Sequence, residues 1–71
     1  MTKYYKITLS LPPAPEWHLF FKTGLDTDGY SPQDLAGLAV DLGFLAADYL
    51  EDVVAVREAS LGEYTRATLV G

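Results

Sequence analysis

The chain has 71 residues, 49% of them hydrophobic, and its ten acidic and five basic residues give a formal charge of −5. This length predicts one domain over residues 1–71, and the absence of cysteine excludes disulfides and thiolate metal sites. The acidic charge disfavours direct nucleic-acid binding, and the lack of a long apolar run or signal-peptide core predicts a cytoplasmic protein without membrane contact.

Two strands are predicted in the first third of the chain. Apolar and polar residues alternate over residues 2–11 and again over residues 17–22, a pattern typical of half-buried strands. The proline-rich segment between them cannot continue a β-ladder and is long enough for an antiparallel return. The core face of the second strand would carry Trp17, Leu19 and Phe21. Phe20 then lies outside beside His18, where it either belongs to an interface or is covered by a loop or a C-terminal hairpin.

A helix is predicted to begin directly after residues 24–30. Ser31 is a suitable N-cap, Pro32 fits the first helical position, and Asp34 at the third completes a capping box. The spacing of the apolar residues predicts a helix from Pro32 to about Leu50, with a bend or a break at Gly43 as the alternative. Its apolar stripe would consist of Leu35, Leu38, Ala39, Leu42, Leu45, Ala46 and Tyr49.

The last third of the chain predicts a C-terminal hairpin. Valine-rich residues 53–59 favour a strand, Gly62 marks a turn, and residues 64–70 favour a last strand. A second helix to about Ser60 is the competing interpretation, because residues 46–57 also fit a helical face. The predicted fold class is therefore α+β in the order ββαββ, with one helix on an antiparallel sheet.

The stretch from Gly24 to Leu35 resembles an EF-hand calcium loop at its beginning. Asp26 and Asp28 alternate before a glycine, as the first ligands of such a loop do. The segment up to Asp34 is too short for the loop of about twelve residues, and no glutamate closes the ligand shell. We therefore expect a turn and a helix cap here and no metal site, with Asp26 and Asp28 as the ligands if weak calcium binding occurs.

No combination of residues in the sequence indicates catalysis. The single histidine, His18, lies among large aromatic residues, and no serine belongs to a recognisable nucleophile motif. No phosphate-binding glycine loop or metal-ligand spacing is present, so no cofactor is expected. We predict that the chain is not an enzyme.

Two surface features of the predicted helix are candidates for partner binding. Asp34, Asp41 and Asp48 repeat with the spacing of a heptad and would form an acidic ridge, which either binds a basic partner or is a solvated face. Val40, Phe44 and Ala47 form a second, smaller apolar strip, whose Val40 and Phe44 meet either the N-terminal loop of the chain or another protein.

These features together predict a small non-catalytic protein that binds a protein partner and acts as a regulator, an inhibitor or an adaptor. An alternative is an acidic inhibitor, of the kind phages and mobile elements use against their hosts, that occupies a nucleic-acid-binding groove of its target. A weak calcium-binding module is a second alternative, and a homodimer is compatible with all three. The expected contact residues are His18, Phe20, Asp34, Val40, Asp41, Phe44 and Asp48.

Overall fold

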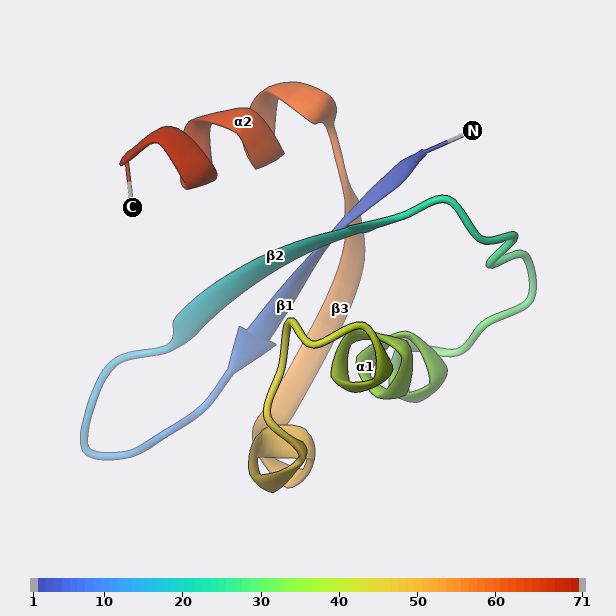
Figure 1. Ribbon diagram of the computed structural model, residues 1–71. Helices are drawn as coiled ribbons and strands as arrows, with labels where there is room; N and C mark the ends of the chain where they lie inside the picture. The colour runs from blue at the N-terminus through green and yellow to red at the C-terminus, as the bar shows by residue number, and fades with distance from the viewer. Residues whose placement is uncertain (1, 71) are drawn as a thin grey trace.

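The computed structural model describes residues 2–70 and shows a small α+β fold with a three-stranded antiparallel sheet (Figure 1). The strand order is β2-β1-β3, so the first strand lies at the centre. In chain order the elements are β1 (Lys3–Leu9), β2 (Trp17–Thr23), α1 (Pro32–Asp41), the short 3₁₀ helix η1 (Ala47–Asp52), β3 (Val53–Ala59) and α2 (Leu61–Val70). The predicted α+β class is confirmed, whereas the predicted order ββαββ is wrong, because the last element is a helix.

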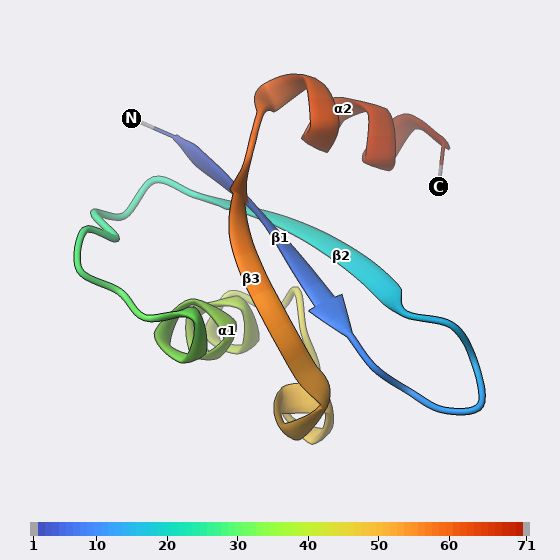
Figure 2. The same cartoon turned by 180° about the vertical axis from the view of Figure 1, so that it is seen from behind.

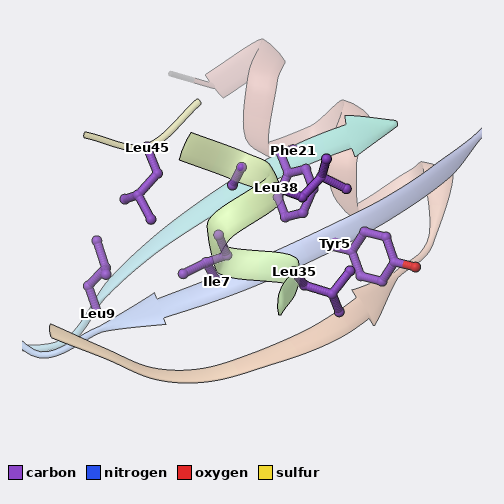
Figure 3. Close-up of a cluster of buried hydrophobic side chains, with 8 residues drawn as sticks. Tyr5, Ile7, Leu9, Phe21, Leu35, Leu38 and Leu45 are labelled. Atoms are coloured by element: carbon purple, nitrogen blue, oxygen red, sulfur yellow. The ribbon is translucent and has the colours of Figure 1, made fainter. Parts of the chain in front are cut away.

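The hydrophobic core lies between one face of the sheet and α1. Side chains alternate across a strand, so directly paired residues share a face; Ile7 pairs with Leu19 on one side and Val56 on the other. This face packs against α1, and Figure 3 shows the helix lying across the strands above the buried side chains. The largest fully buried side chains of the core are Phe21 and Ile7, both with no exposed surface.

The beginning of α1 confirms the predicted cap. The Asp34 backbone N–H donates to the Ser31 hydroxyl, and the Ser31 N–H donates to the Asp34 carboxylate, each over 3.1 Å. Pro32 occupies the first helical position, where its missing N–H removes no helical hydrogen bond.

The end of α1 differs from the prediction, because the helix stops at Asp41 and does not reach Leu50. Gly43 adopts a positive φ of 86°, the conformation that glycine tolerates best. The Gly43 N–H donates to the Val40 carbonyl and the Phe44 N–H to the Ala39 carbonyl, over 3.0 and 2.9 Å. These two bonds form a Schellman cap, which satisfies the last carbonyls of the helix and turns the chain away. The break at Gly43 was therefore the correct alternative.

Residues 53–59 form a strand, as predicted, and the alternative helix to Ser60 is wrong. The partner of β3 is β1, however, and not the C-terminal segment. The register shifts between Thr8, which faces Ala55, and Leu9, which faces Val53, so Val54 is an extra residue that bulges from the edge of the sheet.

The C-terminal segment forms a helix, and the predicted strand over residues 64–70 is wrong. A second capping box begins α2: the Glu63 N–H donates to the Ser60 hydroxyl and the Ser60 N–H to the Glu63 carboxylate, over 3.1 and 3.2 Å. The helix leaves the sheet where β3 ends (Figure 2). The Tyr64 side chain of α2 packs on Tyr4 of β1. The next residue, Tyr5, faces the core, so Tyr4 points to the other face of the sheet, and α2 therefore covers the face opposite α1.

The described helices are all short. Within residues 2–70 none has the length and the apolar character that crossing a membrane requires.

Candidate functional site

A hollow of the described surface lies beside the end of β2, and we refer to it as the β2-edge hollow. Its volume is about 500 Å³. Residues of the N-terminal segment with β1, of β2 with the loop after it, and of the turn after α1 line it: Thr2, Tyr4, Lys22, Thr23, Gly24, Leu25, Leu42 and Phe44. Three of these are large apolar residues with unusually exposed side chains, Leu25 at 53%, Leu42 at 43% and Phe44 at 37%. The hollow therefore presents an apolar surface to the solvent.

Local hydrogen bonds hold the apolar walls of the hollow in place. The Schellman cap reverses the chain after α1, and the Phe44 ring then lies 6.0 Å from the buried Phe21 ring. On the other side, the Leu25 N–H donates to the Thr23 hydroxyl over 3.1 Å, which fixes the turn out of β2. The hollow is thus built from capped, hydrogen-bonded segments.

The predicted apolar strip of Val40 and Phe44 is divided by the structure. Val40 is partly buried and packs against the core, so it meets the chain itself. Phe44 contacts the core through one side of its ring and remains exposed in the hollow. Of the two residues, only Phe44 is placed where a partner could reach it.

Phe20 and His18 lie on the opposite face of the sheet from Phe44. Neighbouring residues on a strand face opposite sides, so Phe20 is directed away from the core that Phe21 enters. Phe20 is half-buried beneath α2, where it borders a hollow of about 360 Å³ together with Glu63, Arg66 and Ala67. The alternative in which the C-terminal segment covers Phe20 therefore agrees with the structure. The covering element is a helix, however, and not the predicted hairpin.

His18 and Trp17 mark the exposed beginning of β2. The His18 Nδ1 lies 3.3 Å from the Thr8 hydroxyl of the neighbouring strand. Trp17, which was predicted to face the core, is 58% exposed, because it pairs with Leu9 at the very end of the sheet.

The three aspartates of the predicted acidic ridge do not lie on one helix. Asp34 belongs to the cap of α1, Asp41 is the last residue of that helix, and Asp48 lies in η1 after the chain has turned. The Asp34 carboxylate is also engaged by the Ser31 N–H. A continuous acidic ridge is therefore absent from α1 and η1.

The cations of this acidic chain gather on the other side of the sheet. Lys6 pairs with Arg57 and Phe20, and Lys22 pairs with Tyr4, which places all of these side chains on the face that carries α2. The Lys22 Nζ lies 5.9 Å from the centre of the Tyr64 ring, and Arg66 belongs to α2 itself. All the cations except Lys3 are thus on or beside this face.

Glu63 is an acidic residue among these cations, and it forms an ion pair with Arg57. Its carboxylate accepts two hydrogen bonds from Arg57, of 2.7 and 3.3 Å. The hydrogen bonds from Arg57 and from the Ser60 amide lower the pKa of Glu63 to about 2. The same pair raises the pKa of Arg57, so both groups are charged at neutral pH.

The candidate calcium ligands belong to a turn. The Asp28 N–H donates to the Asp26 carboxylate over 3.0 Å, and the Lys3 ammonium lies 3.3 Å from the Asp28 carboxylate. The hydrogen bond to Asp28 raises the pKa of Lys3. Residues 2–70 contain no group of three histidine, aspartate or glutamate side chains arranged to hold a metal ion.

Leu25 and Leu42 are the surface residues that the sequence did not reveal. Leu42 fits the apolar stripe of the helix and would be buried if the helix continued, whereas its position as the C-cap leaves it exposed. The glycine that follows Leu42 is the signal that could have identified it.

Comparison with models of protein families, with characterised proteins and with solved structures found no match.

Proposed function

We propose that the chain is a non-catalytic protein that acts by binding another protein at the β2-edge hollow. The observation that carries this proposal is the meeting of three exposed apolar side chains, Leu25, Leu42 and Phe44, around one hollow of about 500 Å³. Large exposed apolar side chains that gather at one place on a soluble domain mark an interaction site.

The hollow has the form of a pocket for an anchoring side chain. Interfaces derive most of their energy from a few apolar or aromatic residues that enter well-formed pockets. Phe44 and Leu42 supply a rigid wall here, because the cap of α1 fixes both positions. Lys22 at the rim adds a charged group that can orient a partner.

The groups with acid–base chemistry support a binding role over a catalytic one. His18 lies against the Thr8 hydroxyl, and the carboxylate with the clearest pKa shift, Glu63, is paired with Arg57 in the cap of α2. Both arrangements orient structural elements and direct no reactive group toward the hollow.

The test compares capture of proteins from the native cell lysate by three versions of the tagged chain. The first is the natural sequence, the second carries Leu25→Ser and Leu42→Ser, and the third carries Leu61→Ser. Leu61 is a matched control, because it is 59% exposed, belongs to α2 and does not line the hollow. Circular dichroism should show the same fold in all three.

We expect one set of proteins to be retained by the natural chain and by Leu61→Ser and to be lost with the double substitution. A set retained equally by all three versions would contradict binding at the hollow. Photo-crosslinking from position 42 then identifies the captured protein that lies within reach of the site.

A further inference from the structure

The outer edge of β2 is a regular strand edge. The strand runs over Trp17–Thr23 (7 residues), contains no proline or glycine, and pairs with β1 without a register shift. Within the part of the chain that the structure describes, no other strand pairs with it. Alternate N–H and C=O groups along this edge are thus able to accept a further strand.

The other edge of the sheet, formed by β3, is less suited to the addition of a strand. Val54 bulges from it, and bulges interrupt the regular spacing that strand addition requires. The segment also follows directly from η1, whose Leu50 lines a hollow with Val53 and Val54 at this edge. The edge of β2 is therefore the one on which a strand can be added.

Positive charge lies on one side of this edge. Lys22 projects from β2 toward the face that carries α2, and Arg66 borders the hollow beneath that helix beside Phe20. Glu63, the acidic residue in the described lining of this hollow, is paired with Arg57. A strand added here would place every second side chain near Lys22 and Arg66, where acidic groups are favoured.

Apolar surface lies on the other side of the same edge. Leu19 and Phe21 belong to the core face, and Phe44 packs beside Phe21. The β2-edge hollow continues this surface at the end of the strand. The intervening side chains of an added strand would meet these residues, where apolar groups are favoured.

We propose that an extended, acidic segment of the partner protein binds as a fourth strand along β2. Its acidic side chains face Lys22 and Arg66, and its apolar side chains face Phe44 and the β2-edge hollow. This inference rests on the proposed function, because it specifies which kind of partner the hollow receives. The complementary charge selects the segment, and the backbone hydrogen bonds of β2 hold it.

The test uses a blocked peptide of about eight residues in which glutamate and valine alternate, titrated into the isotopically labelled chain and followed by NMR. We expect the amide signals of residues 17–23 to shift and their hydrogen exchange to slow, since strand addition pairs the outer edge. The substitution Lys22→Glu should weaken binding roughly fivefold, because it replaces attraction by repulsion. The substitution Lys3→Glu, on a cation of the opposite face, should leave binding nearly unchanged.

Two further probes complete the test. A peptide with lysine in place of glutamate and a uridine oligonucleotide of the same charge as the acidic peptide should both fail to bind. Shifts confined to β3, or equal binding of the lysine peptide or the oligonucleotide, would overturn the proposal, as would unchanged β2 signals with the acidic peptide at millimolar concentration.

These outcomes separate the inference from the proposed function. If Leu25→Ser with Leu42→Ser abolishes partner capture but the β2 amides never respond to the acidic peptide, the hollow binds a partner by another mode. If capture is also unaffected by the double substitution, the hollow itself is not the binding site.

Discussion

The Tyr64 ring of α2 packs on the Tyr4 ring of β1, with centroids 5.0 Å apart. Together with the ion pair between Arg57 and Glu63, this contact holds the C-terminal helix on the face of the sheet opposite α1. The described contacts of the two helices differ: α1 covers a continuous apolar core, whereas α2 contacts the sheet through the Tyr64 ring and the Glu63 carboxylate.

The first prediction concerns this attachment. We expect Tyr64→Ala to release α2 while the sheet and α1 remain folded, because the aromatic pair contributes about 1 kcal/mol beyond its buried area. Hydrogen exchange of the α2 amides should become faster while that of β1 is unchanged. The matched variant Leu61→Ala, at a residue that is 59% exposed, should leave the exchange of α2 as it is.

The second prediction concerns pH. The pKa of Glu63 falls from 4.5 to about 2 because of Arg57 and the Ser60 amide, so the charged form is favoured in the folded state. Its contribution to stability is therefore complete above about pH 4.5 and is lost as the pH falls toward 2.

The variant Glu63→Gln isolates this effect, because glutamine can still cap the helix but carries no charge. The order of α2, measured by NMR between pH 6 and pH 2, should decline more steeply in the natural chain than in the variant. Equal pH profiles of the two would refute the assignment.

The third prediction separates two adjacent phenylalanines. Phe21 has no exposed surface, and Phe21→Ala should cost about 3–5 kcal/mol in the free energy of unfolding. Phe20 is half-buried under α2, and Phe20→Ala should cost only about 1–2 kcal/mol. Urea denaturation measures both, and similar losses would contradict the assignment of the two rings to opposite faces.

The fourth prediction concerns two glycines, Gly37 inside α1 and Gly43 just after its end. Gly43 has a φ of 86°, so Gly43→Ala should destabilise the fold by about 1–2 kcal/mol. Gly37 lies inside the helix with open space around it, so Gly37→Ala should stabilise the fold by about 1 kcal/mol. Thermal denaturation distinguishes the opposite signs, and a shared sign would contradict the cap at Gly43.

The first half of the fold could be predicted from local patterns. Strict alternation identified β1 and β2, and the sequence Ser31, Pro32, Asp34 identified the beginning of α1, because both signals depend on residues close in sequence. The end of α1 could not be settled in the same way. Leu45 continues the helical spacing and is indeed buried, but it reaches the core after the chain has turned at Gly43.

The C-terminal helix carries competing local signals. Threonine, tyrosine and valine in residues 64–70 favour a strand by composition. The same segment begins with Ser60 and Glu63 in the spacing of a capping box, which was the stronger indication. The contact between Tyr64 and Tyr4 connects residues far apart in sequence and was not available to pattern analysis.

Of the three exposed apolar residues around the β2-edge hollow, only Phe44 was predicted from the sequence as a contact residue. The exposure of Leu25 and Leu42 depends on where α1 stops and on how the loop after β2 turns, and both are set by hydrogen bonds specific to this fold. Phe20 was proposed as a companion of Phe44, but the two rings are separated by the sheet, because strand alternation directs Phe20 and Phe21 to opposite faces.

The separation of charge across the sheet gives the molecule a permanent electric dipole. Its positive end lies on the side of Lys6, Lys22 and Arg66, and its negative end on the side of α1, which carries Asp34 and Asp41. Such a dipole turns the protein as it diffuses toward a charged surface, so that one side arrives first. Because the net charge of −5 repels an acidic partner at long range, added salt should speed the first encounter, whereas it should weaken the short-range attraction to Lys22 and Arg66 in the complex.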